Sequence, residues 1–141
     1  MRRNIQTILG IDYGEKRIGI AVGFSEGKIS LPYKIIKNIS KKFVLKELEK
    51  IIKEKNINLM VVGLPYSMSD RNKKSKQFKE IVNFIIFLKN NFNIKVVEQD
   101  ERLSTKTAEE LLLEKKKKKQ KNIKDDVAAS IILQAYLDKI F

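Results

Sequence analysis

The 141-residue chain carries 30 lysines and arginines against 17 aspartates and glutamates, a formal net charge of +13. A field of this sign favours phosphate-rich partners such as nucleic acid, although an AT-rich genome would also produce an excess of lysine. Cysteine and histidine are both absent, which excludes disulfides, thiolate or imidazole metal sites, and catalytic triads built on histidine. Any catalysis must use carboxylates, lysines or hydroxyls.

The first half of the chain predicts three strands. Two β-branched runs over residues 5–12 and 18–22 flank a short glycine-bearing loop, which is typical of an antiparallel hairpin. A third strand is expected over residues 29–36. Pro32 marks it as an edge strand or an irregular strand, because proline cannot donate to the hydrogen-bond ladder.

The rest of the chain alternates helices with short apolar strands. A helical stripe begins near Phe43, with Ser40 as its expected N-cap. Later elements are strands over residues 59–63 and 94–97, a long helix between them through residues 78–88, a helix over residues 104–113, and a last helix capped by Asp125 or Asp126. The order βββαβαβαα predicts an α/β fold with one mixed sheet flanked by helices.

The length favours a single domain over residues 1–141. No apolar run approaches the roughly 18 to 20 residues of a membrane span, and the N-terminus lacks the apolar stretch of a signal peptide. We therefore expect a soluble, cytoplasmic protein with no membrane partner. Whether it is a monomer or a homodimer stays open.

Three acidic residues stand where predicted elements begin or end. Asp12 ends the first strand, Glu101 follows a parallel strand, and Asp125 stands at the start of the last helix. Each also has an ordinary explanation, namely turn chemistry, complementation of a helix dipole and N-capping. Because such positions can meet at one edge of an α/β sheet, we expect the three carboxylates to converge.

Converging carboxylates need a neutralising partner, since each pair at about 4 Å repels by roughly 4 kcal/mol. Oxygen ligands without histidine or cysteine suit Mg²⁺ or Mn²⁺. Such ions activate water and stabilise the leaving oxygen of a phosphodiester. The sequence thus predicts a metal-dependent nuclease in which Asp12, Glu101 and Asp125 are both the catalytic and the metal-binding residues.

Four blocks in order along nearly the whole chain carry a family resemblance. They are Leu9–Gly14 with Arg17–Gly19, Val62–Pro65, Asp100–Thr105, and Asp125–Ala129 with Ile132–Leu137. The chain resembles the YqgF, or RuvX, family of pre-16S rRNA nucleases, also described as Holliday-junction-resolvase-like proteins. The resemblance implies a ribonuclease H-like fold, maturation of the 5′ end of the small-subunit rRNA precursor, and the same three carboxylates. The resemblance favours Asp125 over Asp126 as the third carboxylate, and Asp126 remains the alternative for that role.

Seven basic residues are candidates for contact with nucleic acid. They are Arg17, Arg102, Lys73, Lys74, Lys76, Lys116 and Lys118. The two arginines follow candidate acids and could contact phosphate, or form ordinary salt bridges with Glu15, Asp100 or Glu101. The run from Lys115 to Lys121 could clamp the substrate or be a solvated charge run.

Three functions follow from these features. The first is Mg²⁺-dependent endonuclease action on structured RNA, in particular pre-rRNA. The second is resolution of four-way DNA junctions, which requires a dimer for two symmetric cuts. The third is a non-catalytic RNA-binding role in ribosome assembly. Nucleotide binding in the actin-like manner would need two lobes, which 141 residues do not supply.

Overall fold

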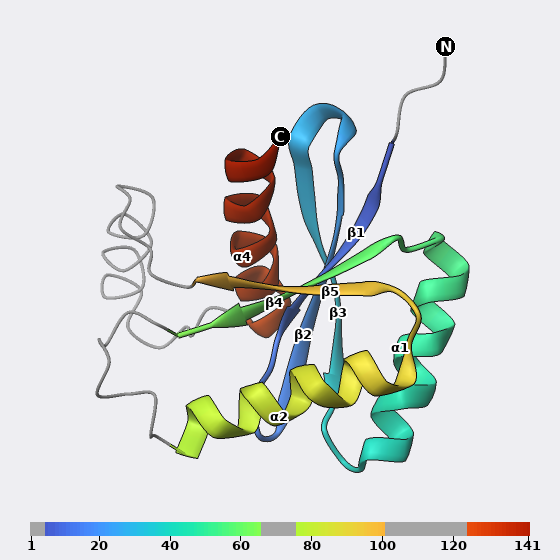
Figure 1. The fold of residues 1–141 in the computed structure, drawn as a ribbon, viewed down its shortest axis with the longest axis vertical. Coiled ribbons are helices and arrows are strands. Elements are labelled where there is room, and N and C mark those ends of the chain that lie inside the picture. Colours follow the sequence, from blue (N-terminus) through green and yellow to red (C-terminus); the bar gives the residue numbers. More distant parts are fainter. Residues whose placement is uncertain (1–4, 66–75, 101–123) are drawn as a thin grey trace.

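The computed structural model describes residues 5–65, 76–100 and 124–141. Its five strands form one mixed sheet in the order β3-β2-β1-β4-β5 (Figure 1). The strands are β1 Thr7–Asp12, β2 Arg17–Phe24, β3 Ile29–Lys37, β4 Leu59–Leu64 and β5 Lys95–Asp100. The predicted α/β class is confirmed.

The strand directions bring three carboxyl ends to the same edge of the sheet. β1 pairs antiparallel with β2, as the predicted hairpin requires, and parallel with β4. β4 in turn pairs parallel with β5. Strands β1, β4 and β5 therefore end at one edge, where Asp12 closes β1 and Asp100 closes β5.

Strand β3 lies at the edge of the sheet that Pro32 predicted. It pairs antiparallel with β2, and the register shifts where Ile20 faces Lys34 while Ala21 faces Pro32. Tyr33 is thus the extra residue of a bulge. A short 3-10 helix, η1 (Glu26–Lys28), joins β2 to β3.

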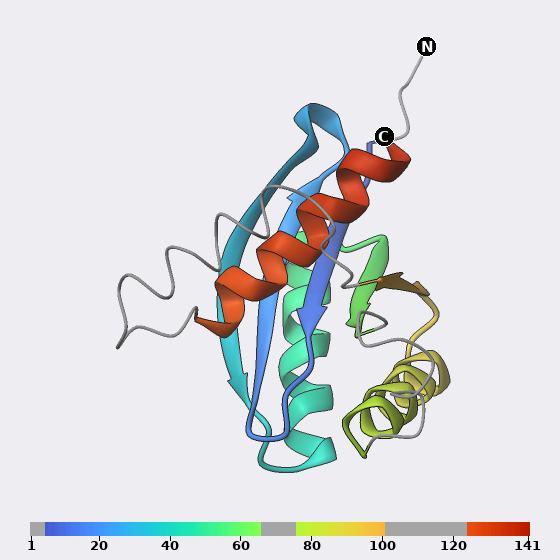
Figure 2. The same ribbon diagram turned by 90° about the vertical axis from the view of Figure 1, so that its left-hand side faces the viewer.

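In the part of the chain that the structure describes, three α-helices cover the sheet, namely α1 (Lys41–Lys55), α2 (Lys76–Asn91) and α4 (Asp125–Ile140). Figure 2 shows α4 on one side of the sheet and α1 on the other. The predicted cap of α1 is confirmed, because Ser40 Oγ accepts a hydrogen bond from the backbone N–H of Phe43 at 3.1 Å. The helix expected over residues 104–113 lies outside the described residues.

The predicted cap of α4 is wrong, because neither Asp125 nor Asp126 occupies the cap position. Asp125 is the first helical residue, and the cap position belongs to Lys124, whose side chain makes no capping hydrogen bond. Asp126 also lies in the first turn, where its Oδ1 accepts from the N–H of Val127 at 2.9 Å. Both acids therefore lie at the positive end of the helix dipole, which stabilises negative charge.

Two apolar clusters fill the space on either side of the sheet. The larger contains Leu9 and Ile11 of β1 and packs under α1 and α2. The smaller contains Ile8 of β1 and packs under α4. Because side chains alternate along a strand, Gly10 and Asp12 lie on the α4 face together with Ile8.

Within the described ranges, none of the helices combines the length and the apolar character that crossing a lipid bilayer demands. The single domain and the cytoplasmic location remain predictions.

Candidate active site

Helix α4 rests directly on glycines of the first two strands. An added Cβ would lie 2.8 Å from Leu133 Cβ at Gly10, 2.7 Å from Leu133 Cδ2 at Gly23, and only 1.9 Å from the backbone oxygen of Asp125 at Gly19. Real Cβ atoms essentially never come closer than 3.0 Å to a neighbour. Glycine at these positions therefore lets the helix approach the sheet, and Gly19 fixes the place where the helix begins.

The same glycine links the start of α4 to the end of β1. Asp12 is the direct cross-strand partner of Gly19. Directly opposed residues of an antiparallel pair present their side chains to the same face. The half-buried side chain of Asp12 therefore lies on the face where Asp125 meets Gly19. Two of the three predicted carboxylates thus come from distant parts of the sequence to neighbouring positions.

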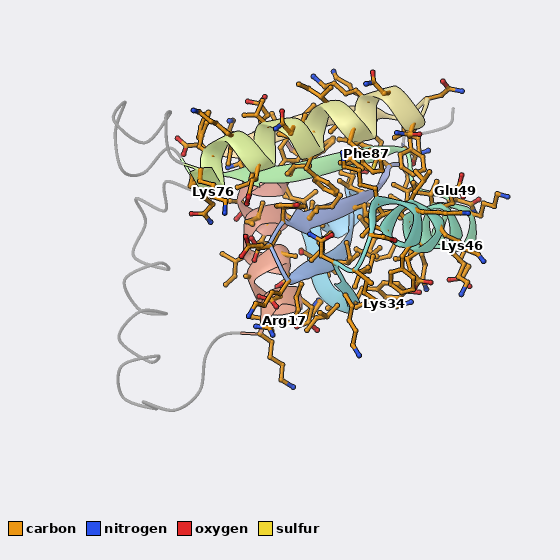
Figure 3. All side chains as sticks on the ribbon, turned by 90° about the horizontal axis from the view of Figure 1, so that it is seen from below. Arg17, Lys34, Lys46, Glu49, Lys76 and Phe87 are labelled. Atoms are coloured by element: carbon orange, nitrogen blue, oxygen red, sulfur yellow. The ribbon has the colours of Figure 1, made fainter. Side chains whose placement is uncertain are left out.

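Arg17 holds the carboxylate of Asp125. Its Nε donates a hydrogen bond to Asp125 Oδ2 at 2.8 Å, and the side chains are 64% and 30% exposed respectively. Figure 3 shows Arg17 beside the start of α4. This ion pair joins Arg17 to an acid other than Glu15, Asp100 and Glu101, which the sequence offered as alternatives. Its guanidinium offsets part of the negative charge at the candidate site.

The end of β5 contributes a residue that sequence reasoning missed. Val97 packs against the cluster under α4, so Gln99, two residues later, lies on the same face. Gln99 is only 7% exposed, and its Oε1 accepts no hydrogen bond from the part of the chain that the structure describes. The signal in the sequence was that Gln99 stands two residues after Val97, at a strand position that faces the core.

The third predicted carboxylate lies beyond β5. Glu101 directly follows Asp100 in the sequence but is outside the described residues. Among residues 5–65, 76–100 and 124–141, no group of three or more acidic side chains could hold a metal ion. Convergence of all three carboxylates therefore remains a prediction.

Of the predicted nucleic-acid contacts, Arg17 and Lys76 can be placed. Lys76 begins α2, and its Nζ lies 3.8 Å from Glu15 Oε2 in the loop between β1 and β2 (Figure 3). Its side chain is 81% exposed. The others, Arg102, Lys73, Lys74, Lys116 and Lys118, fall outside the described residues.

Solved structures of two resolvases share this fold. Thermus thermophilus RuvC in complex with a Holliday junction substrate superposes with a TM-score of 0.61 at 12% identity, covering 95% of this chain and 94% of that one. The fowlpox virus Holliday junction resolvase gives a TM-score of 0.57 at 14% identity, covering 96% and 100%. At these identities the likeness concerns the fold alone, and it confirms the predicted ribonuclease H-like architecture.

Sequence relatives match over almost the entire chain. Proteins named "Putative pre-16S rRNA nuclease" include one from Clostridioides difficile, 42% identical over 133 residues that cover 93% of each chain. Another, from Chloroflexus aggregans, is 39% identical over 138 residues that cover 96% of this chain and 95% of the relative. The family model described as RuvX, Holliday junction resolvase, matches residues 6–139. The chain therefore belongs to the RuvX family, as its four sequence blocks indicated.

Proposed function

We propose that this protein is an endonuclease that cleaves the precursor of 16S rRNA, with Asp12, Glu101 and Asp125 as its catalytic carboxylates. The observation that carries the proposal is the contact of Gly19 with Asp125, because Gly19 is also the partner of Asp12 in the sheet. The names of the relatives from C. difficile and C. aggregans support the choice of substrate.

The residues at this site fit an oxygen-preferring divalent cation. Asp12 and Asp125 offer carboxylate oxygens, the chain has no histidine or cysteine to favour zinc, and Glu101 would complete the set. A bound Mg²⁺ or Mn²⁺ would supply water activation and charge neutralisation at the phosphodiester. Asp12 would hold it from a strand end and Asp125 from the first turn of a helix.

Arg17 has a separate role in this proposal. Its Nε is used by Asp125, but a guanidinium carries five N–H donors. The remaining donors can contact a phosphate of the substrate while the Nε keeps Asp125 oriented. Arg17 would thus position one catalytic carboxylate and bind the nucleic acid backbone at the same time.

The description of the family favours a second candidate, resolution of four-way DNA junctions. This reaction needs two symmetric cuts and hence two copies of the chain. The two candidates share the carboxylates and the cation, so only the substrate separates them. A non-catalytic RNA-binding role in ribosome assembly is the outcome if neither substrate is cut.

One assay tests these functions. Purified protein is incubated with a 5′-extended 16S rRNA precursor or a four-way DNA junction, with Mg²⁺ or with EDTA. We expect Mg²⁺-dependent cutting of the RNA that is lost in Asp12→Asn and in Asp125→Asn. Asp126→Asn is the matched control, because an asparagine can still accept the hydrogen bond from Val127 and should cut like the wild type.

Each alternative has its own result. Cutting of the junction alone would replace the first function by the second. Binding of RNA without any cutting would leave the assembly role. Full activity of Asp12→Asn would refute the carboxylate mechanism on either substrate.

A further inference from the structure

A cavity of about 220 Å³ lies on the face of the sheet opposite α4. It lies between the loop that follows β1, the start of α1 and the side of α2, and three of its lining residues are aromatic, namely Tyr13, Phe84 and Phe87. Figure 3 shows Phe87 on α2. The reaction proposed above uses none of these residues.

The aromatic rings form a continuous apolar surface. The ring centroids of Tyr13 and Phe84 lie 4.5 Å apart at an interplanar angle of 34°. Those of Phe84 and Phe87 lie 6.1 Å apart at 24°, a stacked arrangement. Phe84 is 7% exposed and anchors the surface, whereas Tyr13 and Phe87 are only partly buried. The accessible face of an aromatic ring, such as Tyr13 or Phe87, can bind a nucleobase by stacking.

The polar residues of the cavity suit the edge of a base better than a phosphate. Asn38 is fixed because its Nδ2 donates to the carbonyl of Gly14 at 2.9 Å, which leaves Oδ1 as an oriented acceptor. Glu15 and Glu80 place two carboxylates in the lining beside the ammonium of Lys41, and Lys76 Nζ lies 3.8 Å from Glu15 Oε2. These charges offset one another, so the cavity suits a neutral ring that carries polar groups.

The cavity adjoins the candidate active site along the chain. Tyr13 directly follows Asp12, and it packs against the cluster under α1 and α2 while Asp12 lies on the α4 face. A second hollow, of about 370 Å³, shares Tyr13, Glu15 and Glu80 and extends to Lys76. A nucleic acid strand that crosses this edge of the sheet could therefore place a phosphate at Asp12 and a neighbouring base beside Tyr13.

We propose that the cavity lined by Tyr13, Phe84 and Phe87 binds one unstacked nucleobase of the RNA substrate, next to the phosphate that is cut. This inference rests on the proposed nuclease function and adds a substrate requirement to it. The substrate must have an unpaired nucleotide beside the cleavage position, because a base inside a duplex is stacked and cannot enter the cavity. The site thus selects single-stranded segments or junctions between single and double strands.

The test measures binding in EDTA, so that cleavage does not contribute. Fluorescence anisotropy gives the Kd for an RNA hairpin with a single-stranded 5′ extension and for the same hairpin without it. Phe87→Leu keeps an apolar side chain but removes the stacking surface, and we expect it to weaken binding of the extended hairpin about tenfold. Binding of the blunt hairpin should not change.

Two further variants separate stacking from fold effects. Phe92→Leu is the matched control, because Phe92 packs against the same core but does not line the cavity, and it should bind both hairpins like the wild type. Asn83 on α2 lines the cavity and is exposed, so Asn83→Ala removes a polar group from the lining without changing the core. We expect Asn83→Ala to weaken binding of the extended hairpin and to leave binding of the blunt hairpin unchanged.

Each outcome decides the inference. Equal affinities of Phe87→Leu and wild type for the extended hairpin would overturn it, as would an equal loss for both hairpins. If adenosine monophosphate alone binds the wild type as tightly as the extended hairpin, and Phe87→Leu abolishes that binding, the cavity takes a free nucleotide instead. A loss confined to the extended hairpin, in a protein that cuts neither RNA nor DNA, would refute the nuclease and retain the base site.

Discussion

Replacing Gly19 with alanine should push the start of α4 away from Asp12. The added Cβ would lie 1.9 Å from the backbone oxygen of Asp125, whereas ordinary contacts begin at 3.4 Å. Strand and helix must separate by about 1.1 Å to reach the 3.0 Å limit of real Cβ contacts, and by about 1.5 Å to reach an ordinary contact. Backbone atoms cannot rotate aside, so the whole first turn has to move. Overpacking of this kind typically costs about 1–3 kcal/mol of stability, and a 1 Å misplacement of a catalytic group can cost roughly 100-fold in rate.

The assay compares stability with cleavage. Urea denaturation gives the loss of stability, and single-turnover cleavage of the precursor RNA is measured at a temperature where every variant is folded. Gly23→Ala is the matched control, because its Cβ would meet Leu133 Cδ2 at 2.7 Å and the backbone oxygen of Ile29 at 3.1 Å, and neither residue belongs to the first turn of α4. We expect Gly23→Ala to lose some stability and keep its rate, and Gly19→Ala to lose about 100-fold in rate.

Two results would contradict this reasoning. Wild-type cleavage by a folded Gly19→Ala would show that the start of α4 takes no part in the reaction. An equal loss of rate in Gly19→Ala and Gly23→Ala would show that the rate depends on the position of the whole helix against the sheet, and not on Asp125 in particular.

Three further changes test other contacts. Arg17→Gln should change stability by less than about 1 kcal/mol, since exposed ion pairs contribute little, but should lower the salt slope of RNA affinity by about one; an unchanged slope would restrict Arg17 to holding Asp125. Ser40→Ala should cost about 1 kcal/mol in urea denaturation through loss of the α1 cap, with no effect on cleavage. The hydrogen bond from Lys34 Nζ at 2.8 Å lowers the pKa of the Glu47 carboxyl, so the stability it contributes is present above its unfolded pKa and is lost as the pH falls through its lowered folded pKa. Thermal unfolding should therefore show Glu47→Gln less stable than the wild type near neutral pH and equal to it in acid.

Local patterns predicted the elements that depend on neighbouring residues. The first hairpin, the edge strand with Pro32 and the cap by Ser40 each follow from a few adjacent side chains and their hydrogen-bonding groups. Pro32 also offered an irregular strand as the alternative to an edge strand, but the exact place of the bulge, at Tyr33, depends on how β3 aligns with β2. The start of α4 was misplaced for a similar reason. An aspartate can cap a helix or occupy its first turn, and the contact with Gly19 decides between them.

We expected Asp12 and Asp125 to lie near each other, but not that small residues of β2 would bring the start of α4 to the sheet. Gly19 and Gly23 alternate with Ala21 along one face of β2, and a strand face made of such small residues indicates that another backbone approaches closely. That pattern was present in the sequence and was not used. The place of Glu101 cannot be derived in the same way, because it follows a strand end and no local pattern fixes its direction.

The structure separates what stabilises α4 from what orients its first residue. Ala129, Leu133 and Leu137 are fully buried at a spacing of four residues and anchor the length of the helix. Asp125, by contrast, is held by an exposed arginine, and such a pair contributes little net free energy because solvent screens it. A cation that used the other carboxylate oxygen, with Arg17 still on Oδ2, would therefore leave the core unchanged. A carboxylate with a firmly placed backbone and a weakly held side chain can accept and release a divalent ion without unfolding the helix that carries it.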